Sequence, residues 1–318
     1  MAGFGPILCA TDFSTFSERA FVHAAVLARL LGERLVVVHA RHGSEAPLDD
    51  YPPFLTPVAG IPDVERRLRA RLQAFASPAA KAGVPVTTQV IEGEPAAVLL
   101  GRAAEEAAGL VVVGSHGHGG FERWVLGSVS DKLVRRAPCP VLTVPRPVSE
   151  HEGGAAAGVA DAEPLVGGTI LCGVDFSPAS ERAFALAFRL AVATGSDLAA
   201  VHVVAEFCER DVPSLGHWEV PELRAFLEGE ARTRLKDFVS RVSEAGPGPD
   251  ADAGAGAVAS GSVVAGRPWR RLLDLCRERR ASLLVLGAHG HGPLDALFFG
   301  STAQHALRDA PCAVLTTR

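Results

Sequence analysis

The sequence predicts an α/β protein of two tandem domains, each an open, five-stranded parallel sheet with helices on both faces. Three observations predict this fold. The chain is an internal duplication, each copy alternates strand-like with helix-like patterns, and a glycine-rich loop follows the fourth expected strand of each copy. Alternation of strands and helices is typical of parallel sheets joined by crossover helices.

The duplication is visible in the first expected strand and the turn after it. The segment Ile7–Ser14 returns as Ile170–Ser177, 163 residues later, and both end in Asp-Phe-Ser. From the pair Gly93 and Gly266 onward the separation is 173 residues. The second copy has therefore gained ten residues, and the Gly/Pro/Ala-rich stretch 245–260 is the natural loop for them.

The two copies are joined by a segment with the composition of a linker. Pro145–Gly168 contains prolines, glycine pairs and a short alanine run, which predicts a flexible connection. We expect domains at 1–146 and 168–318, with a linker at 147–167. A chain of 318 residues is long enough for two domains of ordinary size.

The first elements of a copy follow in order. Ile7–Thr11 is a short apolar run and predicts a strand. The polar stretch Asp12–Ser17 provides caps for a helix that continues to about Leu31, where Gly32 ends it. Leu35–His39 is a continuous, valine-rich run, which is typical of a strand covered on both faces.

The remaining elements of the copy alternate in the same way. Helical periodicity, apolar alternation and continuous apolar runs succeed one another. We expect helices at Val64–Lys81, Ala96–Ala108 and Val129–Arg136, and strands at Val86–Ile91, Leu110–Val113 and Val141–Val144.

Composition excludes several classes of protein. The formal net charge is −5 without a basic block, so the sequence gives no electrostatic support for nucleic-acid binding. The chain carries no signal-peptide pattern and no apolar run of membrane-spanning length, so we expect a cytoplasmic protein. Six cysteines form no Cys-x-x-Cys pair, and we interpret them as buried, reduced thiols, four of them on equivalent strands of the two copies.

The glycine loop is the strongest functional motif. Both copies have the pattern Gly-x2-Gly-x9-Gly-Ser between the fourth strand and the following helix. A strand that enters a glycine turn and then a helix presents free backbone N–H groups and the positive end of the helix dipole to an anion. Glycines also permit positive φ and close approach of phosphate oxygens. The motif residues are Gly114, Gly117, Gly127 and Ser128 in the first copy, and Gly287, Gly290, Gly300 and Ser301 in the second.

Other residues near this edge suit supporting roles. Asp12 follows the first strand and is placed to bond a ribose hydroxyl, while Ser128 could both contact phosphate and cap its helix. The alternative is that the glycines only form a tight turn. His116 and His118 lack a third ligand for zinc, so we expect no metal site. His39 is interpreted as a hydrogen-bonded histidine at the end of its strand. The sequence contains no recognisable pattern of a catalytic triad or of a pair of catalytic carboxylates.

These motifs resemble the universal stress protein family. The resemblance rests on Ile-Leu-x-x-x-Asp-Phe-Ser, on the histidine that closes the second strand, on Gly-x-Pro before the third helix, on the glycine loop, and on Ala-Pro-Cys-Pro-Val-Leu-Thr at 137–143. It implies the Rossmann-like, adenine nucleotide alpha hydrolase-like fold with strand order 3-2-1-4-5. Presence of the loop places the chain with the members of the family that bind ATP.

The resemblance also implies the residues that contact the nucleotide. Ala10, Thr11, Asp12 and the Ala40 backbone would line the adenosine side. The phosphate side and the equivalent positions of the second copy complete the set: Gly114, Gly117, His118, Gly127, Ser128, Val129, Gly173, Val174, Asp175, Val203, Gly287, Gly290, Gly300, Ser301 and Thr302.

We therefore expect a stress-response or signalling protein that binds ATP, ADP or AMP, with Mg²⁺ brought only by the nucleotide and no dedicated catalytic site. The alternatives are a weak, metal-dependent ATPase or phosphotransferase, and a dimerisation module that binds no nucleotide. Arg123 favours tighter binding in the first copy, since Asp295 lies beside its equivalent Ala296. In the family the last strand pairs domains, so we expect Val141–Val144 and Val314–Thr317 to pair within the chain, with a homodimer also possible.

Overall fold

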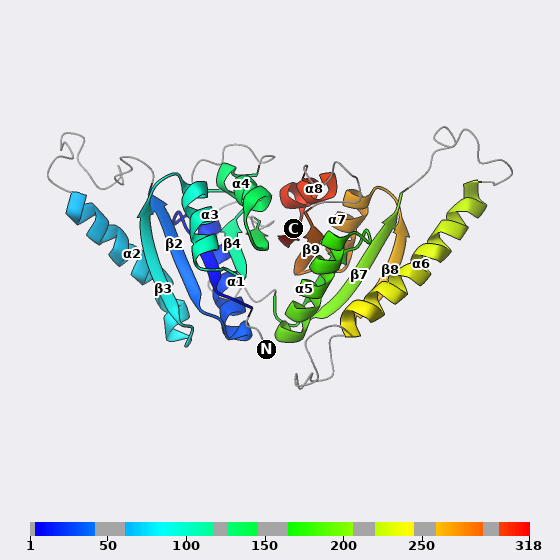
Figure 1. Ribbon diagram of the computed structural model, residues 1–318, viewed down its shortest axis with the longest axis horizontal. Coiled ribbons are helices and arrows are strands. Elements are labelled where there is room, and N and C mark those ends of the chain that lie inside the picture. Colours follow the sequence, from blue (N-terminus) through cyan, green and yellow to red (C-terminus); the bar gives the residue numbers. More distant parts are fainter. Residues whose placement is uncertain are drawn as a thin grey trace. The chain divides into compact units, whose positions relative to one another are not determined.

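The computed structural model describes residues 4–41, 61–117, 126–145, 165–205, 220–244, 259–288 and 299–318. The chain divides into two compact units, one formed by Ala2–Arg146 and the other by Pro147–Arg318. We call them the N-terminal and the C-terminal unit and describe each by itself (Figure 1).

The N-terminal unit is a five-stranded parallel sheet in the order β3-β2-β1-β4-β5. Its elements alternate strictly between strand and helix. They are β1 (Ile7–Ala10), α1 (Thr15–Leu31), β2 (Leu35–Arg41), α2 (Ile61–Lys81), β3 (Val86–Glu92), α3 (Pro95–Glu105), β4 (Leu110–Gly114), α4 (Ser128–Arg136) and β5 (Val141–Val144).

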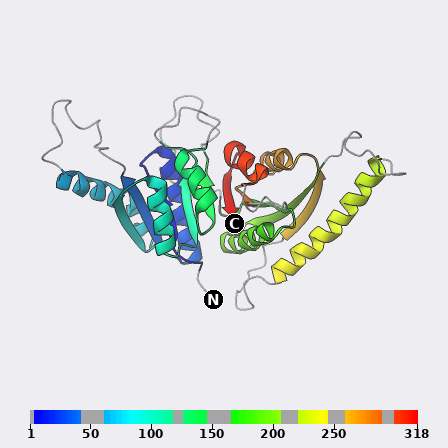
Figure 2. The ribbon, with the colours of Figure 1, turned by 45° about the horizontal axis from the view of Figure 1, so that its top comes forward.

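The C-terminal unit repeats this arrangement in the order β8-β7-β6-β9-β10. Its long helix α6 lies along β7 and β8 (Figure 2). Its elements are β6 (Thr169–Gly173), α5 (Pro178–Thr194), β7 (Asp197–Val204), α6 (Val220–Glu244), β8 (Ala259–Ala265), α7 (Pro268–Glu278), β9 (Leu283–Gly287), α8 (Ser301–Asp309) and β10 (Ala313–Thr317). Within the described residues each copy has five strands, in the order 3-2-1-4-5, and four helices, which confirms the predicted fold.

Burial explains why the strands read as continuous apolar runs. Every residue of β1, β4 and β5 is buried. Right-handed crossovers toward β3 place α1 and α2 on one face, and crossovers toward β5 place α3 and α4 on the other. Phe21 of α1 contacts Phe75 of α2, with ring centroids 4.8 Å apart. Both faces of the sheet are therefore covered by helices, and for this reason apolar and polar residues do not alternate along the central strands.

Helix termini follow the expected signals with small shifts. Ser14 caps α1 and Gly32 ends it at a φ of 66°, as predicted. Strand β2 runs two residues past the predicted end at His39, because its ladder with β3 continues to Arg41 and Glu92, whose side chains are 3.0 Å apart.

Two cysteines are not where the sequence analysis expects them. Cys139 and Cys312 lie in the turns directly before β5 and β10 and not on those strands. In the first copy the reason is Pro140, which has no N–H for the ladder, so that β5 begins at Val141. Cys9 and Cys172 do lie on equivalent strands, β1 and β6.

Contacts that are equivalent in the two copies show where in the second copy the ten extra residues lie. Val37 pairs with Thr88 in the N-terminal unit, and Ala200 pairs with Gly261 in the C-terminal unit. Phe238 occupies the position of Phe75, and these two residues are still 163 positions apart in the sequence. The ten added residues therefore come after Phe238. Of the stretch 245–260, where the sequence analysis expects the insertion, residues 245–258 lie outside the described part of the chain, and Ala259 and Ser260 belong to β8.

Part of the predicted linker belongs to the C-terminal unit. Leu165 is 2% exposed, and its carbonyl accepts a hydrogen bond from the Ser196 hydroxyl at 3.1 Å. The N–H of Gly167 donates to the Thr194 carbonyl at 3.0 Å. The last residues of the predicted segment 147–167 therefore pack against α5 and the start of β7.

Candidate functional site

The candidate site lies where β1 and β4 end. These strands are adjacent and parallel, so the turn after Ala10 and the loop after Gly114 leave the sheet at the same edge. The chain crosses toward β2 and β3 on one side of this point and toward β5 on the other. Ligands of open α/β sheets bind at such a switch point.

The turn after β1 is fixed by its own polar side chains. The Asp12 carboxylate accepts hydrogen bonds from the Ser14 N–H at 3.0 Å and from the Ser14 hydroxyl at 2.5 Å. Ser14 in turn accepts from the N–H of Ser17 and caps α1. Asp12 is therefore held in one orientation at the edge of the sheet.

Gly117 lies directly against this carboxylate. A Cβ on Gly117 would collide with Oδ2 of Asp12. The structure thus brings together two residues that the sequence analysis places in one site, and it gives Gly117 a steric reason to be glycine.

Gly114 must be glycine for a different steric reason. A Cβ there would come within 2.9 Å of the Phe16 Cβ and 3.0 Å of the Phe16 backbone carbon. Gly287 is crowded in the same way by Ala179 and Ser180. These glycines let the first turn of α1 or α5 pack against the end of the fourth strand, whether or not they contact a ligand.

Gly127 closes the loop and begins α4. Its N–H donates to the Ser115 carbonyl at 2.8 Å, and the Ser130 hydroxyl donates to the Gly114 carbonyl at 2.7 Å. Gly127 is the N-cap, and no side chain caps the helix among the described residues. The expectation that Ser128 caps α4 is wrong, because Ser128 is already the first helical residue.

The C-terminal unit repeats this closure. Gly300 is the N-cap of α8, its N–H donates to the Ala288 carbonyl at 2.9 Å, and no described side chain caps the helix. Glycine permits positive φ, but none of the loop glycines that the structure describes adopts it. Gly93 and Gly266 are among the glycines that do, at 146° and 142°. His118, Arg123, Gly290, Asp295 and Ala296 lie outside the described residues.

His116 carries an unsatisfied polar atom in the loop. Its Nδ1 lies 3.0 Å from the Ser115 hydroxyl, and its ring packs on Phe16 with centroids 5.6 Å apart. Within the described ranges, Nε2 of His116 is buried and has no hydrogen-bond partner. Such an atom costs free energy unless a further group bonds to it.

A stack of three side chains supports the Asp12 turn. Phe13 adopts a φ of 63°, which is rare for an aromatic residue. The centroid of the Phe13 ring lies 4.7 Å from that of the His39 ring. The Arg71 guanidinium lies over the Phe13 ring, 4.2 Å from its centroid. The His39 Nδ1–H donates to the Thr11 carbonyl at 2.9 Å, which confirms the interpretation of His39 as a hydrogen-bonded residue.

The same stack recurs in the C-terminal unit. Phe176 has a φ of 65°, its ring lies 4.5 Å from His202, and Arg234 lies 4.3 Å from its centroid. The His202 Nδ1–H donates to the Val174 carbonyl at 2.7 Å. These stacks were not predicted from the sequence, although the repetition of Arg71 as Arg234 at the 163-residue separation was a usable signal.

The two Asp turns are similar but not identical. The Asp175 carboxylate accepts from the Ser177 N–H at 2.9 Å, as in the first copy. Thr11 adds a hydroxyl that accepts from the Phe13 N–H at 3.0 Å, whereas Val174 at the equivalent position has none. The remaining predicted contacts are at the same edges: Ala40 and Val203 near the ends of β2 and β7, Gly173 ending β6, and Ser128, Val129, Ser301 and Thr302 in the first turns of α4 and α8.

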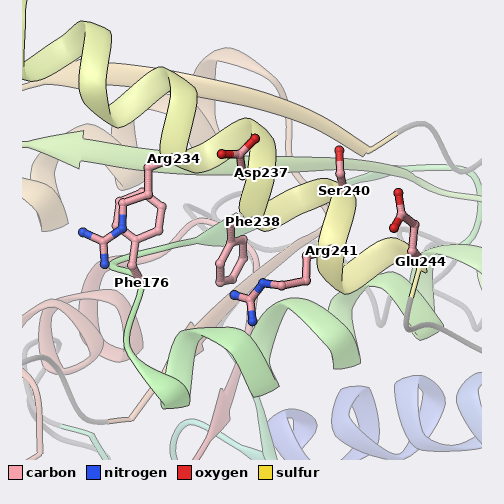
Figure 3. Close-up of a pocket in the computed structure, with 7 residues that line it drawn as sticks. All are labelled: Phe176, Arg234, Asp237, Phe238, Ser240, Arg241 and Glu244. Atoms are coloured by element: carbon pink, nitrogen blue, oxygen red, sulfur yellow. The ribbon is translucent and has the colours of Figure 1, made fainter.

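A pocket of about 480 Å³ adjoins the Phe176 stack (Figure 3). Figure 3 shows Arg234 over Phe176, with Phe238 and Arg241 further along α6. The described lining of this pocket comes from the turn after β6 and from α6. Its lining residues are Phe176, Arg234, Asp237, Phe238, Ser240, Arg241 and Glu244.

Among the described residues, no group of three or more His, Cys, Asp and Glu side chains is arranged to hold a metal ion. None of the described helices is both long and apolar enough to cross a membrane.

Comparison with known proteins agrees with this architecture. The family model described as the Universal stress protein family matches residues 3–145 and 168–318. A universal stress protein of Mycobacterium tuberculosis is 30% identical over 317 residues, which cover 98% of this chain and 96% of that protein. One of Thermus aquaticus is 38% identical over 146 residues, covering 44% of this chain and 98% of that protein.

A solved structure matches both copies at once. The crystal structure of a universal stress protein from Archaeoglobus fulgidus aligns with a TM-score of 0.64 and 18% identity, covering 100% of this chain and 99% of that chain. At this identity the match shows the fold.

Proposed function

Because the chain belongs to the universal stress protein family, we propose that it binds an adenine nucleotide at the carboxyl edge of each sheet and acts in stress response or signalling. ATP is the proposed ligand, with ADP and AMP as alternatives. The observation that carries the proposal is the glycine-capped N-terminus of α4. In the loop before it, Gly117 lies against the fixed Asp12 carboxylate, and Nε2 of His116 is buried and has no hydrogen-bond partner among the described residues.

The N-terminus of α4 suits the phosphates. The first N–H groups of a helix have no partner within the helix, and together with the helix dipole they favour an anion. Gly127 supplies no capping side chain, so a ligand oxygen can take the place that a serine or aspartate oxygen takes in other helices. The same argument applies to Gly300 and α8.

Asp12 suits the ribose better than the phosphates. A carboxylate accepts hydrogen bonds from hydroxyl groups and repels phosphate oxygens. One oxygen of Asp12 is used by Ser14, which fixes the direction of the other toward the loop at Gly117. Nε2 of His116 supplies a further polar atom for the ligand. Residues Ala10, Thr11 and Ala40 border the adenosine side of this edge.

The first experiment identifies the ligand. Mass spectrometry of small molecules released from freshly purified full-length protein should detect ATP, ADP or AMP. Titration calorimetry of the ligand-free protein should then show binding of ATP. Cyclic AMP belongs in the same panel, because a universal stress protein has been solved in complex with it.

Single-site variants test the location. Asp12→Asn keeps an oxygen for Ser14 and removes the charge, so it should weaken binding at the first site roughly tenfold or more through one charged hydrogen bond. Asp175→Asn should do the same at the second. Asp197→Asn is the matched control, because Asp197 is an exposed carboxylate at the start of β7, the opposite end of the strands. Equal binding by all variants, or no binding by the parent protein, contradicts the proposal.

The enzymatic alternative has a separate test. A weak ATPase or phosphotransferase would use Mg²⁺ carried by the nucleotide to polarise a phosphate. We propose that the protein binds without a dedicated catalytic base. Sustained, Asp12-dependent phosphate release in an ATPase assay with Mg²⁺ or Mn²⁺ would favour the enzyme.

Pairing of the copies is also a proposal. In the family the last strand pairs domains, and we propose that β5 and β10 do so within this chain. Cysteine pairs introduced across Val141–Val144 and Val314–Thr317 should crosslink within one chain. Crosslinking only between chains would indicate a homodimer instead.

A further inference from the structure

The outer edge of β3 has no strand beside it among the described residues, since β3 is the end strand of its sheet and pairs only with β2. At the start of this ladder the Leu35 N–H donates to the Pro85 carbonyl, and at its end the Gly93 N–H donates to the Arg41 carbonyl. Odd-numbered residues of β3 therefore bond to β2, because successive residues of a strand bond to opposite sides. The even-numbered residues direct their N–H and C=O groups outward: Val86, Thr88, Val90 and Glu92.

β3 lacks the features that protect natural edge strands. Such edges are short, or they carry a bulge, a proline or a lysine. β3 has seven residues, pairs with β2 residue by residue without a bulge, contains no proline, and has its one charge at the final residue, Glu92. The equivalent edge strand β8 has Gly261 in place of Thr88, and glycine weakens a strand. Of the two edges, β3 is the better template for a further strand.

A groove of about 470 Å³ follows this edge. The Gln89 amide donates to Glu106 at the end of α3, at 3.3 Å, so the side chains of β3 alternate between the α3 face and the α2 face. The groove therefore reaches both faces of the sheet around the edge of β3. Its lining comes from one segment of β3 and from both neighbouring helices: Thr88–Ile91, Arg69, Leu72 and Gln73 of α2, and Arg102 of α3.

The charged side chains that line the groove are paired. Arg69 forms an ion pair with Glu65, and Arg102 forms ion pairs with Glu105 and Glu106. Two molecules therefore approach each other at this edge without repulsion between unpaired arginines.

We propose that β3 pairs in antiparallel orientation with β3 of a second copy of this chain, centred on Gln89. An extended backbone is the ligand that matches N–H and C=O groups repeating at every second residue. In this register Thr88 lies opposite Val90 of the partner subunit, and Val86 lies opposite Glu92 of the partner subunit. Each of these pairs exchanges two hydrogen bonds, so that about eight hydrogen bonds join the two strands.

The register also separates like charges. Because Gln89 is the central residue of β3, antiparallel pairing uses the whole strand and places the two Glu92 carboxylates at opposite ends. They are then about 20 Å apart along the strands, well beyond the distance at which salt screens exposed charges. Pairs of valine with threonine occupy the centre, and such cross-strand pairs stabilise sheets.

A proline at an outward position tests this pairing while leaving the bonds to β2 in place. Val90→Pro removes an N–H that points away from β2, and edge strands tolerate proline at such positions. Symmetry removes two intermolecular hydrogen bonds, so the dissociation constant of the dimer should rise roughly tenfold or more. Val263→Pro is the matched control, because Val263 is the equivalent outward residue of β8, and it should change nothing. Sedimentation velocity of the full-length proteins over a range of concentrations measures the change.

Introduced cysteines test the register. The two residues at position 89 should face each other with Cα atoms about 4.5 Å apart, which suits a disulfide. Gln89→Cys should therefore give a covalent dimer under mild oxidation, linked through position 89 in peptide mass spectrometry. Thr87→Cys alone should not, because residue 87 lies opposite residue 91, whereas a mixture of Thr87→Cys and Ile91→Cys proteins should. The parent protein, oxidised in the same way, gives the background from its six native cysteines.

The outcomes are separable. Circular dichroism and urea unfolding first establish that Val90→Pro is folded, and if it is not, the cysteine variants decide. A parent protein that remains monomeric at every concentration would overturn the proposal. So would equal association of the parent and a folded Val90→Pro variant, equal weakening by Val90→Pro and Val263→Pro, or crosslinking of Thr87→Cys as efficient as that of Gln89→Cys.

Discussion

Replacement of His23 by leucine should remove a defined part of the acid sensitivity of this protein. His23 lies on α1, is 2% exposed, and its Nδ1 is hydrogen-bonded to the Arg19 carbonyl at 3.0 Å. Burial, together with the nearby charge of Arg19, lowers the pKa of His23 from its usual 6.5 to about 4. The equivalent residue of the second copy is Leu186, so leucine already fits this helix face.

The magnitude follows from proton linkage. Between pH 6.5 and about 4 the unfolded chain binds a proton at His23 that the folded protein does not. Stability is therefore full above the unfolded pKa of His23 and falls as the pH drops through this window. For these two pKa values the loss between pH 7 and pH 5 is about 2 kcal/mol.

Urea unfolding of the parent protein and of His23→Leu at pH 7 and pH 5 measures this loss. The parent should lose about 2 kcal/mol more than the variant over that interval, since all other titrating groups are shared. The reciprocal variant Leu186→His should add a similar acid-sensitive contribution to the C-terminal unit. An equal pH dependence of the parent and His23→Leu would refute the reasoning.

Three further predictions follow from backbone conformation and packing. Phe13→Ala should destabilise by about 2–4 kcal/mol through loss of two ring contacts and the Arg71 interaction. Phe13→Gly should be about 1 kcal/mol less destabilising than Phe13→Ala, because glycine tolerates the φ of 63°. A glycine variant that is less stable than the alanine variant in urea unfolding would count against this account. Ala107 follows α3 and has a φ of 47°, so Ala107→Gly should raise the free energy of unfolding by about 1 kcal/mol. The midpoint of urea unfolding should then rise, and an unchanged or lower midpoint would contradict this prediction. Gly114→Ala should cost about 1–3 kcal/mol by displacing Phe16, and an unchanged melting temperature would show that α1 moves freely.

The site predictions differ in how far the structure supports them. Asp12 and Gly117 come together although 105 positions separate them, because adjacent parallel strands end at the same edge. Gly114 has a packing reason that is independent of any ligand. The glycine pattern therefore combines two requirements: close helix packing at its first position, and at Gly127 a helix N-terminus that no described side chain caps.

The sequence by itself determined the duplication, the number and order of elements in the described parts of each copy, and the edge of the sheet at which the candidate site was expected. These properties depend on local patterns: apolar runs such as Leu110–Val113, caps such as Ser14, and helix-ending glycines such as Gly32. They repeat between the copies, and each repetition strengthened the prediction. The resemblance to a family added the strand order and the ligand class that we propose.

Only the tertiary structure decided which side chains meet across elements. The stack of Arg71, Phe13 and His39 joins α2, the turn after β1, and β2. Periodicity along one element assigns residues to a face, but it carries no information about the partner on another element. That partner is fixed when helices and strands pack together, and the chemistry of these contacts exists only in the folded chain.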